Sequence, residues 1–512
     1  MPTYHRNHVT ARVRRAGHSA EIATANRVLP DVVAPGRDRG AARKPGPHRG
    51  RLDGRHGQQP VNANAPRVVV VGSGFAGFFA ARTIERCIPP AAAELTIISA
   101  TAHMCYSPLL PEVAAGRLNA LQIAVPLHGA LRRTRILQGI VDAVDLDART
   151  VTAQCGLDEP AVIPWDRLVL TLGSVTRTFP VPGLAEHGLG LKTLVEADYI
   201  HDHVLRQLEI AAATTDPAVR RARLTFVVVG AGYAGTETAA QLHRMTLAQL
   251  GRFPSLSRDD VSWVVLDVAG SVLPELGPRL GRLALSVLRK RGLQVRLGTS
   301  VTEITTGSVT LSDGSTLPTH TVLWTAGVTP PPLVQRTHLP MLGGRLVVDA
   351  YLQVRDHVWA AGDAASAPDP SRSPGSAYPP TAQHAQRQGV VIGHNVAASL
   401  NHGPPRRYRH RDLGLVADLG GTAAVARPLG IPVSGVAAKI ITKLYHLYAL
   451  PSPANRVRVA ASWLLNLFGP PLGAQVGLVS PDAARLDVAE HTARPAILTN
   501  SCAGDSTTGP WS

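Results

Sequence analysis

A β-branched run passes directly into a glycine loop at Val68-Val69-Val70-Val71-Gly72-Ser73-Gly74-Phe75-Ala76-Gly77. Four consecutive valines are typical of a short strand that is buried on both faces of a parallel sheet. The glycines have the spacing GxGxxG, and a helix-like stretch follows from Phe78 to Arg86. In such a loop Gly72 makes the tight turn, Gly74 lets a pyrophosphate approach the backbone, and Gly77 lets helix and strand pack closely. The strand, loop and helix together predict a dinucleotide site.

A second copy of this pattern lies near the middle of the chain. An apolar run that ends in Val229 leads into Gly230-Ala231-Gly232-Tyr233-Ala234-Gly235, and a helix-like stretch begins at Thr236. The next predicted strand ends at Asp267, whose carboxylate can accept hydrogen bonds from an adenosine ribose and would repel a 2′-phosphate. Because no arginine follows Asp267 closely, the second loop favours NAD over NADP. Two such loops predict two nucleotide sites in one chain.

The first loop departs from the second at the ribose position. The strand after it, Leu95-Thr96-Ile97-Ile98, ends at Ser99, where an acidic residue is expected. We therefore expect the ribose of the first nucleotide to be held by Ser99, by backbone groups or by water.

Length and charge restrict the class of protein. The 512 residues are too many for one core and indicate two or three domains. Residues 1–65 hold twelve Lys/Arg and four Asp/Glu, a surplus of +8 that is half of the chain's +16. We interpret this segment as a disordered basic leader or as translation from an upstream start codon, and it lacks the apolar run of a signal peptide. The concentration of charge there weakens a nucleic-acid function, although an arginine-rich arm stays open.

The cysteines and the apolar runs exclude further classes. Cys87, Cys105, Cys155 and Cys502 have no CxxC spacing, which argues against a zinc site, a disulfide scaffold and a redox dithiol. A reducing, cytosolic location is the default that follows. The uncharged stretch from Val459 to Pro481 is interrupted by Gly469-Pro470-Pro471, so we expect no membrane-spanning helix.

Two further segments resemble a known superfamily. Leu168-Val169-Leu170-Thr171-Leu172-Gly173-Ser174 and Val358-Trp359-Ala360-Ala361-Gly362-Asp363-Ala364-Ala365 are strands followed by turns of small residues. With the glycine loops they resemble the two-dinucleotide-domain flavoproteins, which have the α/β, glutathione-reductase-like architecture of two Rossmann-like domains. The resemblance implies that the first loop holds FAD, the second holds NAD(P)H, and Asp363 binds the ribityl chain. The implied FAD residues are Gly72, Gly74, Gly77, Ser99, Thr171, Gly173, Gly362 and Asp363, and the NAD residues are Gly230, Gly232, Gly235 and Asp267.

Within that superfamily the chain resembles the type II NADH dehydrogenases from Arg67 to about Phe468. Ser107-Pro108-Leu109-Leu110-Pro111-Glu112-Val113-Ala114 is similar to the family's PLL-x-EVA segment, and Val322-Leu323-Trp324-Thr325-Ala326-Gly327-Val328 is similar to its W-T-A-G-V turn. Glu237, after the second loop, stands where the family has a glutamate near the nicotinamide. The resemblance implies a respiratory-chain flavoprotein that oxidises NADH through FAD and reduces a membrane quinone without pumping protons.

The quinone side of the resemblance rests on Thr381 to Gly389, which is similar to the pattern A-Q-x-A-x-Q-Q-G. Gln383 and Gln388 match the pattern, whereas Arg387 replaces a glutamine. The resemblance implies positioning roles for Gln383 and Gln388 near flavin and quinone. His384 stays open between a proton relay and a structural residue, and a lone histidine in a helix favours the structural role.

The C-terminal region carries an amphipathic pattern. In the stretch from Gly435 to Leu450, one predicted helical face is apolar and another carries Lys439, Lys443 and His446. Cationic flanks beside an apolar stripe suit the headgroups of an anionic bilayer, with Trp463 as an interfacial anchor. A surface helix that packs on the protein or on a second subunit is the alternative, and a homodimer stays open. The family resemblance favours a peripheral protein on the cytoplasmic face of the cell membrane.

The expected domain plan follows from these motifs. It comprises a basic leader (1–65), an FAD-binding domain in two parts (66–190 and 331–400) around an NADH-binding domain (191–330), a membrane-associating region (401–481) and an irregular tail (482–512). Two rival functions stay open. One is a soluble NAD(P)H reductase for a ferredoxin- or rubredoxin-like protein, and the other is a sensor that binds flavin and NADH without turnover.

Overall fold

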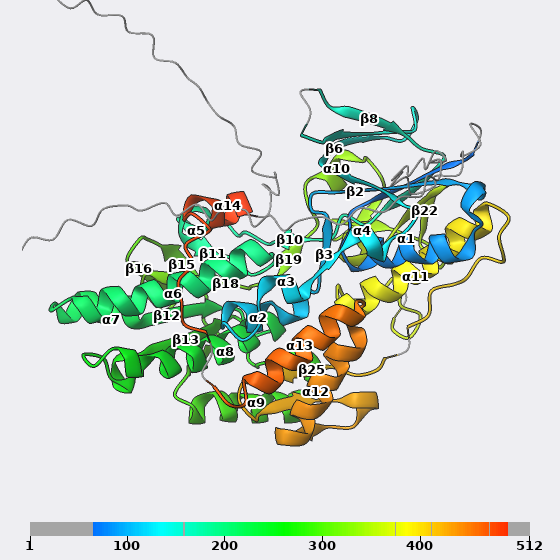
Figure 1. Ribbon diagram of the computed structural model, residues 1–512. Coiled ribbons are helices and arrows are strands. Elements are labelled where there is room, and N and C mark those ends of the chain that lie inside the picture. The colour runs from blue at the N-terminus through cyan, green and yellow to red at the C-terminus, as the bar shows by residue number, and fades with distance from the viewer. Residues whose placement is uncertain (1–64, 157–158, 374, 411, 470–471, 490–512) are drawn as a thin grey trace, which may run out of the picture. The chain divides into compact units, whose positions relative to one another are not determined.

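The computed structural model describes residues 65–156, 159–373, 375–410, 412–469 and 472–489. All of them lie within one unit of contacts, Gln59–Ser512. The predicted basic leader, up to residue 64, and Cys502 lie outside the described residues. Two mainly parallel sheets with helices packed on them hold the two glycine loops (Figure 1).

The first sheet contains the first glycine loop. Its six strands run in the order β22-β23-β9-β1-β2-β5. Strand β1 (Arg67–Val71) pairs in parallel with β2 (Glu94–Ser99) and with β9 (Arg167–Leu170). The remaining strands are β5 (Arg135–Gln138), β22 (Gln353–Arg355) and β23 (Val358–Ala360). Residues that are almost 300 positions from β1 along the chain therefore complete the same sheet.

Two helices of this sheet approach each other closely. Helix α1 (Phe75–Cys87) follows the first loop, and α11 (Ala382–Ser399) lies alongside it (Figure 1). A Cβ at Gly389 would lie 2.2 Å from the carbonyl oxygen of Ala76, so a side chain there would force the helices apart. This contact brings the segment with Gln383 and Gln388 next to the first loop.

The second sheet contains the second glycine loop. Its five parallel strands run in the order β11-β18-β12-β13-β14. Every residue of β12 is buried, as a strand covered on both faces requires. The strands are β11 (Gly188–Leu189), β12 (Thr225–Val229), β13 (Ser262–Asp267), β14 (Gln294–Leu297) and β18 (Thr321–Trp324). The main helices of this part are α6 (Leu194–Ala213), α7 (Pro217–Leu224), α8 (Tyr233–Gln249) and α9 (Pro278–Lys290).

A short ribbon connects the turns that follow the two sheets. Strand β10 (Val175–Thr176) leaves the turn after β9, and it pairs antiparallel with β19 (Val328–Thr329), which leaves the turn after β18. The ribbon holds these two turns close to each other. Antiparallel additions flank the sheets: β6 (Ile140–Asp145), β7 (Thr150–Gln154) and β8 (Ala161–Pro164), and also β15 (Val301–Ile304), β16 (Ser308–Leu311) and β17 (Thr316–Pro318).

The C-terminal region is a small sheet with two helices. The sheet consists of β25 (Val416–Asp418), β26 (Ala424–Ala426) and β27 (Val433–Ser434), and α12 (Gly435–Ala449) packs on it. Helix α13 (Pro453–Leu465) begins six residues before the uncharged stretch that starts at Val459. Ser452 accepts a hydrogen bond from the Asn455 amide and Pro453 occupies the first turn, which is the usual start of a helix. No helix among the described residues has both the length and the apolar character needed to cross a bilayer.

The prediction of an irregular tail from residue 482 is wrong for residues 482–489. These residues form a 3₁₀ turn (Asp482–Ala484) and α14 (Leu486–Ala489). Leu486 is buried against α5 (Leu184–His187), and Arg485 bridges to Leu189. Eight residues with two large apolar side chains, Leu486 and Val488, are too short a stretch to give a periodic signal, which is why the contact was not predicted. The rest of the tail lies outside the described residues.

Candidate functional site

The first glycine loop is held by one threonine. The Thr171 hydroxyl donates to the carbonyl oxygen of Val71 at 2.7 Å, and the Thr171 amide donates to the same oxygen at 2.9 Å. Gly72 has a φ of +98°. A Cβ at Gly77 would lie 1.9 Å from the Gly72 carbonyl oxygen and 2.5 Å from Thr171 Oγ1. The close packing predicted for Gly77 is therefore present in the structure.

The second loop repeats this geometry with different residues. The Thr325 hydroxyl and amide both donate to the carbonyl oxygen of Val229, each at 2.8 Å. A Cβ at Gly235 would lie 1.9 Å from the Gly230 carbonyl oxygen and 2.5 Å from Thr325 Oγ1. The two loops thus share one structural motif, in which a threonine that follows the neighbouring strand fixes the turn.

Both loops leave room for an anion at the start of a helix. A Cβ at Gly74 or at Gly232 would meet no atom within 4 Å. These residues are the N-caps of α1 and α8, and neither helix has a side chain that caps its first amides. Free amide groups and the positive end of the helix dipole attract a phosphate. The residues present therefore fit the pyrophosphate of a dinucleotide at each loop.

A cavity of about 450 Å³ extends from the first loop. Its lining includes seven of the eight residues that were predicted to bind FAD. They come from the first loop and from turns in distant parts of the chain. The predicted residues among them are Gly72, Gly74, Ser99, Thr171, Gly173, Gly362 and Asp363. A groove of this size that begins at the backbone of the glycine loop suits an extended cofactor.

Asp363 is linked to a lysine that was not predicted. Asp363 Oδ2 accepts a hydrogen bond from Ser174 Oγ at 2.7 Å, and Ser174 Oγ accepts one from Lys192 Nζ at 2.7 Å. Lys192, Ser174 and Asp363 all line the cavity. The sequence signal near Lys192 is a capping box in which Thr193 and Glu196 start α6. That signal locates a helix but not the partner of the preceding lysine.

Ser99 lies in the cavity but is already paired. Its hydroxyl is 2.6 Å from the hydroxyl of Ser73, and both side chains are buried. The Ser73 hydroxyl also donates to the carbonyl oxygen of His103 at 3.1 Å. If Ser73 donates in that way, Ser99 is the donor in the serine pair, and its oxygen keeps acceptor capacity. The ribose position is therefore occupied by a neutral hydroxyl pair instead of a carboxylate.

Asp267 ends β13 and turns towards the second loop. Its Oδ2 accepts a hydrogen bond from the Ala231 amide at 2.5 Å, and its Oδ1 accepts one from the Ala269 amide at 2.7 Å. Each carboxylate oxygen keeps a lone pair that can accept from a ribose hydroxyl. The next residue, Val268, is 73% exposed and apolar, so the position that could bind a 2′-phosphate carries no cation.

Glu237 lies one turn into α8 and is largely enclosed by protein. Burial, followed by the nearby carboxylates Asp418 and Glu112, raises the pKa of Glu237 to about 8. Its Oε1 accepts a hydrogen bond from the backbone amide of Asp418 at 2.6 Å. A carboxyl with this pKa is protonated at neutral pH, so it can both donate and accept a hydrogen bond.

The cations of α12 face inward, and the prediction that they meet lipid headgroups is wrong. Lys439 Nζ donates to Asp418 Oδ1 at 2.6 Å, and Lys443 pairs with Glu112 and lies 3.4 Å from Asp418 Oδ2. Burial lowers the pKa of His446 to about 3, so this residue is neutral, and its ring bonds with the Tyr106 hydroxyl. Buried carboxylates attract these cations more strongly than solvent does, and the sequence pattern did not contain the carboxylates' positions.

Trp463 belongs to the same buried cluster. Its Nε1 donates to Glu112 Oε2 at 2.6 Å, and Lys443 Nζ lies 4.1 Å from the centre of its ring. The expected interfacial anchor is therefore an internal contact between α13 and α2 (Leu110–Ala114). Burial would raise the pKa of Asp418, but Lys443 and Lys439 outweigh burial and hold that pKa below its ordinary value. We call Glu112, Asp418, Lys439, Lys443 and Trp463 the buried charge cluster.

Gln388 supports the turn that carries Asp363. Its Oε1 accepts a hydrogen bond from the Gly362 amide at 2.8 Å, and the side chain is buried. Gln383 stands at the start of α11, between Ala382 and Ala385, which line the cavity. Its Nε2 donates to the Gly414 carbonyl oxygen at 2.8 Å, whereas its Oε1 is buried without a partner among the described residues. A buried polar atom without a partner is costly and suggests that a ligand meets it.

Arg387 and His384 contact an aromatic group that includes Tyr408 and His410. His384 Nδ1 is 2.7 Å from the Tyr408 hydroxyl, and its ring lies 3.9 Å from that of His410. Arg387 Nη1 is 2.9 Å from His410 Nδ1. Burial, followed by His410 and Arg387, lowers the pKa of His384 to about 4. These contacts favour the structural role of His384, which is neutral and fully engaged at neutral pH.

The described cysteines form no dithiol. Cys87, Cys105 and Cys155 are all free, and only Cys105 among them lines the cavity. Burial raises the pKa of the Cys105 thiol to about 12, so the thiol stays protonated and is a poor nucleophile. The described part of the cavity therefore contains no pair of sulfurs for disulfide chemistry.

Comparison with known proteins identifies the relatives of this chain. Residues 66–389 match the family described as pyridine nucleotide-disulphide oxidoreductase. The type II NADH:quinone oxidoreductase NdhA of Mycobacterium tuberculosis is 32% identical over 419 residues, which is 79% of this chain and 87% of that protein. The demethylphylloquinone reductase NdbB of Synechocystis is 31% identical over 79% of this chain and 97% of that protein.

The fold is also similar to solved structures. NDH2 of Plasmodium falciparum, solved in complex with NADH, superposes with a TM-score of 0.73 over 80% of this chain and 99% of that chain. The two sequences are 16% identical, so this likeness concerns the fold alone.

Proposed function

Because the chain belongs to the pyridine nucleotide-disulphide oxidoreductase family and, within it, to the type II NADH:quinone oxidoreductases, we propose that it oxidises NADH through bound FAD and reduces a quinone without pumping protons. The observation that carries this proposal is the duplicated loop. Each loop pairs a threonine-locked glycine turn with an uncapped helix start, and the first opens into a cavity. We assign the first loop to FAD and the second to NADH.

The flavin, when bound, supplies the two-electron chemistry between hydride donor and acceptor. The chain's own residues position the reactants. Asp363 and Gly362 would hold the ribityl chain, and Gln388 keeps their turn in place. Asp267 would bind the adenosine ribose of NADH, and Glu237 would position the nicotinamide through its protonated carboxyl.

We place the quinone near the start of α11. Gln383 has an amide oxygen that no described group satisfies, and its neighbours in α11 line the flavin cavity. Arg387 points to His410 and the aromatic group, so we assign it a structural role and not a contact with the quinone. Gln388 acts indirectly, through Gly362.

We further propose that α12 and α13 bind the membrane through an outward apolar face. The face comprises Val436, Ile440, Leu444, Tyr448, Val457, Leu464, Leu465, Leu467 and Phe468, all more than half exposed. We call it the C-terminal apolar surface. Exposed apolar patches of this kind are rare on soluble proteins and mark sites of contact with partners or membranes. A peripheral position on the cytoplasmic face of the cell membrane gives the quinone site access to lipid and the second loop access to NADH.

The activity is tested by anaerobic reduction of the purified holoprotein. We expect NADH to bleach the flavin, a quinone to restore its absorbance, and NADPH to react much more slowly. Asp267→Asn should raise KM for NADH about ten-fold, because it replaces a charge-assisted hydrogen bond to the ribose by a neutral one. Bleaching by NADH without reoxidation by any quinone, but with reoxidation by a ferredoxin, would support the soluble reductase instead. A flavin that NADH leaves oxidised would contradict the enzymatic proposal.

The membrane contact is tested with point variants. Removal of all residues after Gly435 would also remove the partners of Glu112 and Asp418, so it would disturb the folded core. We therefore compare Leu465→Gln/Phe468→Gln with the control Val162→Gln/Leu342→Gln, which alters exposed apolar residues on β8 and β20 (Met341–Leu342).

The first pair should lose sedimentation with lipid vesicles while bleaching by NADH is retained, and the control should keep both. A variant that turns a dimer into a monomer and leaves vesicle binding intact would identify this surface as a subunit interface.

A further inference from the structure

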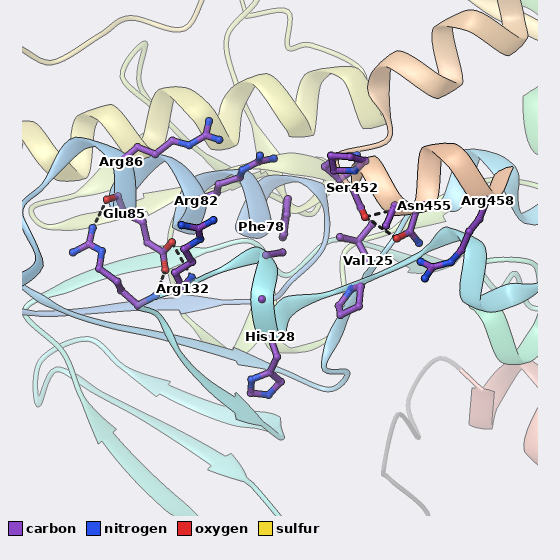
Figure 2. Close-up of a pocket in the computed structure, with 17 residues that line it drawn as sticks. Phe78, Arg82, Glu85, Arg86, Val125, His128, Arg132, Ser452, Asn455 and Arg458 are labelled. Carbon is purple, nitrogen blue, oxygen red and sulfur yellow. Dashed lines mark hydrogen bonds between the residues drawn. The ribbon is translucent and has the colours of Figure 1, made fainter. Parts of the chain in front are cut away.

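A cavity of about 690 Å³ lies outside the proposed flavin and NADH sites. It is formed by α1, by the segment that contains α4 (Leu127–Ala130) and the following residues up to Arg133, and by the start of α13 (Figure 2). Its lining carries five arginines and one glutamate, a net charge of +4. The arginines are Arg82, Arg86, Arg132, Arg133 and Arg458.

The single carboxylate in the cavity is already bound by backbone groups. Glu85 Oε1 accepts hydrogen bonds from the amides of Arg133 and Thr134, both at 2.8 Å, and Glu85 Oε2 accepts one from the Arg132 amide at 3.2 Å. The Arg133 guanidinium donates to the carbonyl oxygens of Glu85 and Ile88. Glu85 thus anchors the loop and forms no ion pair with the arginines that surround it.

Four of the arginines are left for a ligand. Arg82, Arg86, Arg132 and Arg458 form no side-chain hydrogen bond or ion pair with any described residue, and Figure 2 shows them on both sides of the cavity. Burial, followed by the charges of Arg86 and Arg456, lowers the pKa of Arg82. Because the charges of Arg86 and Arg456 act on Arg82, these cations repel one another, and a bound anion would relieve the repulsion.

The start of α13 adds to this positive field. Pro451, Ser452, Pro453, Ala454 and Asn455 line the cavity at the N-terminus of a helix of 13 residues. The positive end of the helix dipole therefore reinforces the arginines.

One lining residue of the cavity is adjacent in the chain to a residue of the C-terminal apolar surface. Arg458 lines the cavity, and the preceding residue, Val457, is 70% exposed. Asn455 also lines the cavity, and its side chain donates to the carbonyl oxygen of Leu121, whose own side chain is 77% exposed. Two exposed apolar residues, Val457 and Leu121, are therefore neighbours of residues that line the cationic cavity, and Val457 belongs to the surface that we assign to the membrane.

From this arrangement we infer that the cavity binds the phosphate of an anionic phospholipid. The arginines and the α13 N-terminus hold the headgroup phosphate, and the acyl chains lie along Val457 and the rest of the C-terminal apolar surface. A free phosphate would use the cationic groups but not the apolar surface. This inference rests on the proposed membrane contact. It specifies the class of lipid that is bound and the site that binds it.

The test compares two charge-matched variants of the holoprotein. Arg86→Gln/Arg458→Gln removes two exposed, unpaired cations from the cavity. Arg221→Gln/Arg336→Gln removes two exposed arginines from α7 and α10 (Leu333–Arg336), where the structure shows no side-chain partner among its described residues. Bound flavin and the rate of bleaching by NADH report whether each variant is folded.

Vesicles of phosphatidylcholine, with and without phosphatidylglycerol, measure the lipid preference. We expect the wild-type protein and the α7/α10 control to bind the anionic vesicles about ten-fold more tightly than the neutral ones. The cavity variant should bind both alike. Equal losses in the two variants would show a general charge effect, and an unchanged preference in the cavity variant would show that the cavity is not used. Either result overturns the inference.

Monomeric short-chain phosphatidylglycerol and inorganic phosphate distinguish the two sources of phosphate. The lipid should bind to the wild-type protein and not to the cavity variant, and phosphate should bind much more weakly. Equal binding of both would identify a site for free phosphate and overturn the lipid assignment. Wild-type protein that binds neither kind of vesicle would contradict the proposed membrane contact. Wild-type protein that binds both kinds equally would contradict only the proposed binding of an anionic phospholipid in the cavity.

Discussion

Thr171 and Thr325 show how much a single residue contributes to each nucleotide loop. Each donates twice to the last carbonyl oxygen of the strand before the loop, and each hydroxyl would meet a Cβ at the third glycine. The glycines provide space, and the threonines hold the turn that uses it. The W-T-A-G-V and L-T-L-G-S segments therefore both hold a nucleotide loop, and the L-T-L-G-S segment also lines the flavin cavity directly.

The third glycine of each loop gives a paired prediction. In Gly77→Ala and in Gly235→Ala the new Cβ would lie 1.9 Å from a carbonyl oxygen, which costs about 1–3 kcal/mol of overpacking and opens the loop. Gly77→Ala should lose most of its flavin. Gly235→Ala should keep its flavin and show at least about a ten-fold higher KM for NADH. Flavin absorbance and NADH titration measure the two effects.

Gly251→Ala is the control, because a Cβ there meets no atom within 4 Å. It should behave as the wild-type protein does. A Gly77→Ala protein that retains stoichiometric flavin with unaltered NADH kinetics would contradict the assignment of the first loop.

At the scale of elements, α12 is an amphipathic helix with an unusual orientation. Its lysines and its histidine face the protein, and Ile440, Leu444 and Tyr448 face outward. The reason is the buried charge cluster, in which Glu112 from α2 and Asp418 from β25 need counter-ions. The helix therefore serves two purposes. It neutralises two buried carboxylates and exposes an apolar face.

Removal of one cation should destabilise the whole C-terminal region. Lys443→Met leaves Glu112 and Asp418 with one lysine instead of two, and we expect a loss of about 3–5 kcal/mol in the free energy of unfolding. Denaturant unfolding measures this loss. Lys290→Met, at the exposed end of α9, should change the free energy by less than about 0.5 kcal/mol.

A second substitution sharpens that prediction. In Lys443→Met/Glu112→Gln the charge that was left unpaired is removed, so part of the lost stability should return. Equal losses in the single and double variants would show that the ion pair is not the cause.

At the scale of the whole molecule, Glu237 makes stability depend on pH. Its pKa in the folded protein is about 8, against an ordinary value of 4.5. Between these values the folded state binds more protons than the unfolded state, so stability falls as the pH rises from about 4.5 through about 8. Glu237→Gln should lessen this decline. The denaturation midpoint, measured from about pH 5 to about pH 9, gives the slope.

Glu303→Gln, which changes an exposed glutamate on β15, should leave that slope unaltered. If Glu237→Gln retained the full wild-type slope, other groups would have to account for it.

The nucleotide loops could be predicted from the sequence because their geometry is local. Strand, turn and helix start lie within about ten consecutive residues, and the glycine spacing reports backbone conformations that few other residues adopt. The family membership, the NADH:quinone class and the α/β fold followed from these motifs, and the comparisons support them. The individual site residues remain predictions, although most of those assigned to FAD line one cavity.

Contacts between residues that are far apart in the sequence could be identified only in the tertiary structure. Lys443 and Glu112 are 331 positions apart, and no pattern within α12 shows that its lysines have a carboxylate to meet. The same holds for Lys192 beside Ser174 and for the arginines of the cationic cavity, which come from three separate segments. Helical periodicity defines the two faces of α12, but the partners placed by the tertiary fold decide which face is buried, because the energy of a buried charge depends on its neighbours in space.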